Sequence, residues 1–270
     1  MIKHIGAWLL GVAAVTAVVL AGGSAEAVTV TWNTCADGSD TGSTCTPGGL
    51  TQSGRTSTGS GVDQTFTFEG IGDPTRLLIT EAFATQNSIA PYGFVVKREI
   101  GIFEGGLGAG TESSPQHAVD NIGPDEMIVF MFGADSYIPK SFRIGYMNTD
   151  ADIVTYIGGA GTGFLTALQL GTFNWDTFLA DPLAMGFTQQ TFLDVPVGVD
   201  QLFTNGASGR YLIIGARNET DSCYSHPCEG GEDAFKIQQV VGELPVPEPG
   251  TLLLLGLGVT ALAGFARRRP

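Results

Sequence analysis

The sequence VDQTFTFE (Val62–Glu69), followed after a short turn by TRLLITEAFAT (Thr75–Thr85), decides the class of fold. In the first segment Phe66 and Phe68 alternate with polar residues, and the second segment is rich in branched and aromatic side chains. Such runs, bounded by Gly, Asp and Pro, are typical of β-strands joined by turns. We therefore expect an antiparallel pair of strands over these residues.

The same pattern continues along the chain and predicts an all-β protein. Seven further runs of this kind are Tyr92–Phe103, Glu126–Phe132, Ser141–Met147, Ile153–Ile157, Gln189–Val195, Tyr211–Ala216 and Ala234–Val241. Short strands separated by turn residues indicate an antiparallel β-sandwich, which we expect to be jelly-roll-like. Helix is expected at Phe173–Ala180, Phe164–Leu170 is ambiguous, and the Gly-rich runs Gly105–Gly110 and Gly158–Gly163 are interpreted as loops.

The N-terminus predicts export. Lys3 precedes the apolar stretch Ile5–Ala21, and Ala25 and Ala27 are small residues at the two positions that a signal peptidase reads. We expect residues 1–27 to be a signal peptide, formed by an apolar helix and cleaved after Ala27. A retained N-terminal anchor is the alternative.

The segment 28–61 is polar and rich in Ser, Thr and Gly, and we expect a flexible leader in which Trp32 is exposed. The β-sandwich domain is expected to occupy residues 62–243. The four cysteines of the chain fall into two local pairs, Cys35 with Cys45 and Cys223 with Cys228. Their spacing does not fit a zinc site, and in an exported chain two local disulfides are expected.

The C-terminal segment 244–270 has a Pro-rich start, an apolar run over Thr251–Ala266 and a basic end. As a helix, the run would be about 24 Å long, somewhat short of a hydrocarbon core of about 30 Å. A buried helix of a soluble domain would show a polar face, which this run lacks. We therefore expect a transmembrane helix, and by the positive-inside rule the residues before it lie outside the cytoplasm.

These residues resemble the PEP-CTERM sorting signal of bacterial surface proteins. The residues that carry the resemblance are Pro247, Glu248 and Pro249 before the apolar run, and Arg267, Arg268 and Arg269 after it. The resemblance implies that an exosortase processes the chain near the Pro-Glu-Pro triplet. It also implies a Gram-negative-type bacterium, in which the chain is anchored transiently in the inner membrane before it reaches the cell surface or the medium.

The composition narrows the choice of ligands. The formal net charge is −14, and charged residues make up only 15% of the chain. Nucleic acid is therefore not an expected partner, because its binding depends on basic side chains. An acidic exterior fits either a well-solvated secreted protein or one that binds divalent cations.

Oxygen-bearing side chains gather between the Gly-rich run and the strand at Glu126–Phe132. Candidate calcium ligands are Asp120, Asn121, Asp125 and Glu126. Carboxylate and carbonyl oxygens are the ligands that calcium prefers, although the spacing is not that of an EF-hand. The alternative is that Asp120 and Asn121 form side-chain turns. A second acidic cluster, Asn148–Asp152, would complete a calcium site if the fold brings the two loops together.

A second resemblance covers most of the chain from about Thr65 to Val241. The matching stretches are GLG (106–108), SPQHAVDNIGPDE (114–126), IVFMF (128–132), IGYMNTDADIVTYIG (144–158), RYLIIGARN (210–218) and DAFKI (233–237). They are similar to a family of exosortase-dependent surface proteins built on one extracellular β-domain. The resemblance implies a secreted or surface-retained protein without an assigned activity.

Catalytic signatures are weak. The adjacent carboxylates at Asp125/Glu126 and Glu232/Asp233 do not form acid–base pairs by themselves, because neighbouring strand residues point to opposite faces. No Gly-x-Ser-x-Gly motif occurs. Aromatic residues that could stack on sugar rings or belong to the core are Tyr92, Tyr137, Tyr146, Tyr156 and Trp175.

The sequence therefore predicts a non-enzymatic, exported cell-surface or extracellular-matrix protein. Its expected partners are signal peptidase, the exosortase and, transiently, the inner membrane. The first alternative is a calcium-dependent carbohydrate-binding module in the exopolysaccharide or biofilm layer. The second is a secreted hydrolase.

Overall fold

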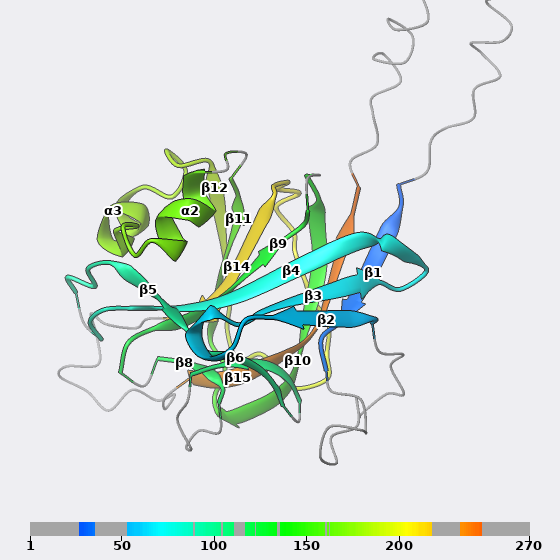
Figure 1. The fold of residues 1–270 in the computed structure, drawn as a ribbon, viewed down its shortest axis with the longest axis horizontal. Helices are drawn as coiled ribbons and strands as arrows, with labels where there is room; N and C mark the ends of the chain where they lie inside the picture. The colour runs from blue at the N-terminus through cyan, green and yellow to red at the C-terminus, as the bar shows by residue number, and fades with distance from the viewer. Residues whose placement is uncertain are drawn as a thin grey trace, which may run out of the picture. The chain divides into compact units, whose positions relative to one another are not determined.

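The fold consists mainly of β-strands (Figure 1). The computed structural model describes residues 27–35, 53–88, 90–103, 105–110, 117–121, 123–133, 136–159, 161, 163–217 and 233–244. These residues contain fifteen strands, two short α-helices and one 3-10 turn at Gly61–Asp63. All the strands pair in antiparallel fashion and form two sheets, which confirms the expected antiparallel β class.

Sheet 1 is built around the two long strands β10 (Ile138–Thr149) and β15 (Asp233–Glu243). Five shorter strands complete it, in pairs with β10, with β15 or with one another. They are β1 (Thr29–Asn33), β6 (Ile100–Phe103), β7 (Gly106–Ala109), β8 (Val119–Asp120) and β13 (Gln201–Leu202). The last strand, β15, therefore pairs with β1, β7, β8 and β10, which come from the beginning and the middle of the domain.

Sheet 2 has the strand order β12-β11-β14-β9-β4-β3-β2, with β5 paired to β4. Its strands are β2 (Arg55–Thr58), β3 (Thr65–Gly70), β4 (Asp73–Thr85), β5 (Val95–Arg98), β9 (Glu126–Met131), β11 (Ile153–Gly158), β12 (Phe187–Phe192) and β14 (Tyr211–Ala216). The hairpin expected from the two opening segments is present as β3 and β4.

The two sheets share a hydrophobic core, and sheet 2 carries a second core on its outer face. Because side chains alternate along a strand, Ile128 and Phe130 of β9 pack between the sheets, whereas Met127 and Val129 point outward. Every residue of β9 is buried. A strand that is apolar on both faces is expected where both faces are covered.

Two short helices cover the outer face of sheet 2: α2 (Gly163–Gln169) and α3 (Trp175–Ala180). Figure 1 shows both beside β11 and β12. Asn174 caps α3, because its side-chain oxygen accepts hydrogen bonds from the backbone N–H and the hydroxyl of Thr177. Trp175 and Phe178 of α3 then pack into the outer core. The helix expected at Phe173–Ala180 is thus confirmed as α3. The ambiguous segment Phe164–Leu170 is also largely helical and belongs to α2.

Three expectations for local structure were wrong. Part of the predicted flexible leader forms β1 and β2, and Trp32, expected to be exposed, is 0% exposed in the core between the sheets. The Gly-rich run expected as a loop contains the buried strand β7. Its glycines are required there, since a side chain at Gly108 would collide with the backbone of His117.

The described strands and helices belong to one compact unit, Thr29–Leu244. Among the described residues, no helix has both the length and the apolar character needed to cross a membrane. The predicted signal helix lies outside the described residues, except for Ala27. The predicted C-terminal transmembrane helix also lies outside them. The jelly-roll-like topology stays a prediction.

Candidate functional site

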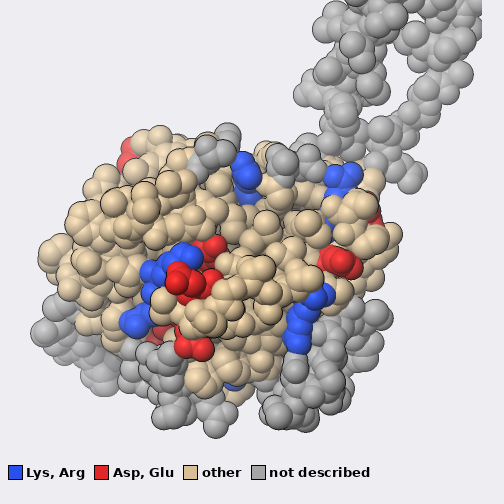
Figure 2. Space-filling model, viewed as in Figure 1, with Lys and Arg blue, Asp and Glu red and all other residues tan. Residues whose placement is uncertain are grey.

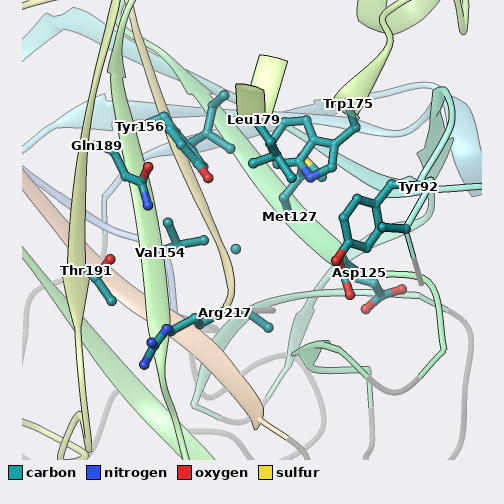
Figure 3. A pocket seen from close by; sticks show the side chains of 15 residues that line it. Tyr92, Asp125, Met127, Val154, Tyr156, Trp175, Leu179, Gln189, Thr191 and Arg217 are labelled. Atoms are coloured by element: carbon teal, nitrogen blue, oxygen red, sulfur yellow. The ribbon is translucent and has the colours of Figure 1, made fainter. Parts of the chain in front are cut away.

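A cavity of about 370 Å³ opens on the outer face of sheet 2 (Figure 3). Its walls come from strands β9, β11, β12 and β14, from helix α3 and from the segment before β5. The lining combines aromatic rings with polar and charged side chains. The aromatic residues are Tyr92, Tyr156 and Trp175, and the polar ones are Asp125, Glu126, Gln189, Thr191 and Arg217. Its volume is within the range of small-ligand sites.

The aromatic walls are held by packing within the outer core. The rings of Tyr156 and Trp175 lie 5.8 Å apart at 83° to each other. Phe178 supports both of them, with its ring 4.8 Å from that of Tyr156 and 4.9 Å from that of Trp175. These contacts fix two ring planes at nearly a right angle beside the cavity.

The segment that carries Tyr92 is tied to helix α3 by Asp176. The two carboxylate oxygens of Asp176 accept hydrogen bonds from the backbone N–H groups of Tyr92, at 2.7 Å, and of Gly93, at 2.8 Å. In return, the backbone N–H of Trp175 donates to the carbonyl of Gly93 at 2.8 Å. The positions of Tyr92 and Trp175 are therefore coupled through three hydrogen bonds.

Asp125 brings a carboxylate to this aromatic site. Figure 3 shows its carboxylate and the hydroxyl of Tyr92 pointing toward one another. Its backbone is fixed by Thr85, whose hydroxyl accepts from the N–H of Asp125 and whose own N–H donates to the carbonyl of Asp125. Burial and the nearby charge of Asp125 raise the pKa of Tyr156 far above its ordinary value. The hydroxyl of Tyr156 is therefore uncharged at neutral pH.

Glu126, the neighbour of Asp125, also lines the cavity. Its side chain is almost buried, and its Oε1 lies 4.0 Å from Nε of Arg98 on β5. Of the second carboxylate doublet, Glu232/Asp233, only Asp233 belongs to the described residues.

The other two candidate calcium ligands lie at the edge of sheet 1. Asp120 ends β8, opposite Ala234 of β15. Asn121 is held by Asp233: the Nδ2 group of Asn121 donates to Oδ2 of Asp233, and Oδ1 of Asn121 accepts from the N–H of Asp233, both at 3.0 Å. Asn121 thus links the end of β8 to the start of β15.

The fold also brings together three carboxylates from distant parts of the sequence. Ligand atoms of Asp150, Asp152 and Asp233 lie within 4.8 Å of one another. The sequence left open whether Asn148–Asp152 and the loop around Asn121 meet, and Asp233 is the residue that contacts both Asn121 and Asp152. Apart from the acidic residues next to Asp233, its local sequence does not indicate these contacts. Calcium binding by these residues or by the original four stays a prediction.

Protein groups already engage these carboxylates. Asp233 accepts from the N–H of Asp152 at 2.8 Å, and Asp152 accepts from the N–H of Asp194 at 2.8 Å and from Nη1 of Arg217 at 3.3 Å. Asp150 accepts from the N–H of Ala151. Donated hydrogen bonds and the guanidinium offset the mutual repulsion of the three charges. Arg217 also lines the cavity, so it links the acidic cluster to the aromatic site.

The remaining aromatic candidates have structural contacts. Tyr137 packs with Trp32 and Phe132 between the sheets. Tyr146 lies on sheet 1, where its ring is 4.5 Å from the ammonium group of Lys236. Of the five aromatic residues considered from the sequence, the fold therefore gathers Tyr92, Tyr156 and Trp175 at one cavity.

On the face shown in Figure 2, the described charged residues are few. Uncharged residues dominate this view, and near its middle basic and acidic groups lie side by side. Lys97, for example, lies 3.7 Å from carboxylate oxygens of both Asp63 and Glu81. This mixture agrees with the acidic composition.

Some of the predicted disulfide, cleavage and sorting residues lie outside the described residues. Cys35 is buried and disulfide-bonded, but its expected partner Cys45 lies outside the described residues, as do Cys223 and Cys228. Ala27 is described, whereas Ala25 is not. The sorting residues Pro247, Glu248, Pro249, Arg267, Arg268 and Arg269 also lie outside.

Comparison with known families finds a match at the C-terminal end of the chain. The family description "PEP-CTERM protein-sorting motif" matches residues 245–269. The chain therefore carries a PEP-CTERM sorting motif over these residues, and this motif indicates a secreted protein that is processed by an exosortase in a Gram-negative-type bacterium. Comparison with curated proteins and with solved structures finds no match to the chain.

Proposed function

We propose that this protein is a non-enzymatic component of the cell surface or extracellular matrix, and that its β-domain is the part delivered to the outside. The PEP-CTERM motif at residues 245–269 carries this proposal. The last strand, β15, ends at Glu243, and the compact unit ends at Leu244. Cleavage near the Pro-Glu-Pro triplet therefore leaves the folded unit whole.

Export in this proposal proceeds in two cuts. Signal peptidase removes residues 1–27, and the C-terminal apolar run then holds the chain in the inner membrane until the exosortase acts. Two local disulfides fit this route, because they form in the oxidising periplasm. The bonded state of Cys35 supports the first of them.

The intact mass of the protein from its native producer tests the proposal. We expect a species that begins at Val28, ends near Pro249 and gains about four mass units on reduction, since each disulfide takes up two hydrogens. A mass that still contains Thr251–Pro270 would mean a permanent anchor and would contradict exosortase processing.

A pair of variants makes this test specific for the motif. Glu248→Ala alters the recognised triplet and is expected to leave the full C-terminus in place. Pro245→Ala changes a neighbouring proline outside the triplet and should be processed normally. Equal processing of both variants would show that the triplet is not what the membrane enzyme recognises.

A second candidate function is a calcium-dependent carbohydrate-binding module in the exopolysaccharide layer. The cavity favours it, because three aromatic residues lie with Gln189 and Thr191 in one site. Aromatic faces with nearby hydrogen-bonding groups suit sugar rings. The calcium part is supported by the three carboxylates within 4.8 Å of one another.

The melting temperature with millimolar calcium and with a chelator tests the calcium part. Wild type is expected to melt at a higher temperature with calcium, and Asp120→Ala and Asp150→Asn should reduce this difference. Asp63→Asn, an exposed carboxylate outside the cluster, is the control. An unchanged melting temperature in wild type would remove calcium from the proposal, and retention on a polysaccharide column tests the carbohydrate part separately.

A further inference from the structure

The aromatic walls of the cavity form a corner. The ring planes of Tyr156 and Trp175 lie at 83° to each other, and Tyr92 lines the same cavity from the connection between β4 and β5. A sugar ring stacks best on one broad, accessible face, whereas rings at right angles surround a compact, rounded group. A cavity lined in this way resembles an aromatic cage, which binds cations through the negative faces of the rings.

The cage is prearranged by its own framework. Phe178 supports Tyr156 and Trp175 from behind, and Asp176 ties the backbone of Tyr92 to the start of α3. Because the rings are already fixed, little side-chain entropy is lost when a ligand enters. Met127 adds an apolar, polarizable floor.

The charges of the cavity favour a cation over an anion. Two carboxylates, Asp125 and Glu126, line the cavity with one guanidinium, that of Arg217. The guanidinium is shared with Asp152 at 3.3 Å, and Glu126 lies 4.0 Å from Arg98. Asp125 is the carboxylate next to the rings, and its charge contributes to the raised pKa of Tyr156. A negative potential beside electron-rich ring faces attracts positive charge.

We propose that this cavity binds a substituted ammonium group, with Tyr92, Tyr156 and Trp175 around the cation and Asp125 as its counter-charge. Two sources carry this chemistry: an amino sugar of a glycan and a small quaternary amine. In the first case the proposal deepens the carbohydrate-binding candidate and rests on it. In the second case it is independent of carbohydrate binding, and in both it is independent of exosortase processing.

Matched pairs of ligands test the charge directly on the purified full chain. Calorimetry in phosphate buffer, which contains no competing amine, compares choline with its neutral isostere 3,3-dimethylbutan-1-ol, and glucosamine with glucose. We expect one of the charged ligands to bind at least about tenfold more tightly than its neutral partner, because the cation–π and Coulomb contributions are lost with the charge. The preferred pair identifies the source.

Equal binding of the charged and neutral members of both pairs would overturn the proposal. If glucose and glucosamine bind equally well and neither member of the choline pair binds, the site is a plain sugar site and the carbohydrate-binding candidate survives alone. If no member of either pair binds, the ammonium proposal fails, while the intact-mass test still decides the export function. These comparisons use wild type and do not depend on the folding of any variant.

Variants then assign the binding to this cavity. Asp125→Asn keeps the shape of the side chain and is expected to weaken the charged ligand about tenfold while leaving the neutral one unchanged. Trp175→Leu should weaken both ligands. Asp63→Asn removes one exposed negative charge elsewhere and should bind as wild type does. Charged-ligand binding that persists in Asp125→Asn at wild-type strength would contradict the assigned counter-charge.

Discussion

The two tryptophans in the described residues, Trp32 and Trp175, pack on opposite sides of sheet 2. Trp32 comes from β1 and is buried between the sheets, where its indole N–H donates to the carbonyl of Arg76 at 3.1 Å. Rings of Phe132 and Tyr137 lie 5.6 and 5.5 Å from it. Trp175 starts α3 in the outer core and lines the cavity.

The difference shows how one residue type serves two purposes. The side chain of Trp32 is fully buried and its N–H group is hydrogen-bonded, so we assign Trp32 a role in stability. Around Trp175, Phe178 supports the ring while the cavity leaves space for another molecule. The inner core depends on contacts between sheets, and the outer core depends on local contacts of α3 and the segment before β5.

The largest effect is expected from Trp32→Ala. Removing a fully buried indole leaves a cavity between the sheets and removes the hydrogen bond to the carbonyl of Arg76. We expect the free energy of unfolding to fall by about 3–5 kcal/mol, measured by urea denaturation followed by circular dichroism.

Trp175→Ala is the comparison for this variant. Trp175 is also buried, but its ring already borders a cavity, so we expect a cost at the lower end of that range, about 3 kcal/mol. A larger loss of stability for Trp175→Ala than for Trp32→Ala would reverse the roles assigned to the two sites.

An intermediate effect is expected from Asp176→Ala. This variant loses both hydrogen bonds to the N–H groups of Tyr92 and Gly93, as well as a negative charge in the first turn of α3. We expect a cost of about 2 kcal/mol and weaker ligand binding at the cavity, since Tyr92 is no longer held against α3. Denaturation and calorimetry measure the two effects.

Asp181→Ala is the matched control for Asp176. Asp181 follows the same helix and accepts one hydrogen bond, from the N–H of Ala184, without contact to the cavity segment. Its removal should cost less and leave binding unchanged. Equal loss of binding in both variants would show that general weakening of the helix, rather than the tie to Tyr92, controls the cavity.

The smallest effect on stability is expected from the titration of Tyr156, which changes the free energy of unfolding only at alkaline pH. Burial and the charge of Asp125 raise the pKa of its hydroxyl in the folded state above the ordinary value of 10. The unfolded chain therefore loses this proton first as the pH rises, so the stability is fully present below pH 10 and declines above it. Melting temperatures between pH 8 and about 11 should fall more steeply for wild type than for Tyr156→Phe.

Parallel melting curves for the two proteins would mean that Tyr156 is not buried as described. The matched variant for the inner core is Tyr137→Phe, which tests whether the decline belongs to the cavity side. This comparison separates the titration of one cavity residue from the general effect of alkaline pH on the fold.

Local sequence pattern predicted the central strands well. Tyr211–Ala216 was expected as a strand and is β14 with the same bounds, because a short apolar run between turn signals has few other ways to bury itself. Thr75–Thr85 likewise corresponds to β4. Segments without that pattern were missed: Thr29–Asn33 and Gly106–Ala109 become strands through pairing with β15, which lies far away in the sequence.

The candidate site was foreseen only in parts. Asp125, Tyr92, Tyr156 and Trp175 were each noted from the sequence, but as members of different hypotheses. Their meeting depends on the order of strands in sheet 2 and on the position of α3, which periodicity does not encode. The same holds for Asp233, whose contact with Asp152 spans 81 residues.

The sequence by itself determined the export address and the β-rich class of this protein. A sorting signal consists of contiguous residues, such as the Pro-Glu-Pro triplet, and strand character follows from the local alternation of side chains. Only the tertiary structure decided that Trp32 is core, that glycines 106 and 108 pair within a sheet, and that an aromatic corner meets Asp125 at a cavity. These features depend on contacts between residues distant in the chain, and such contacts are set by the packing of the whole domain.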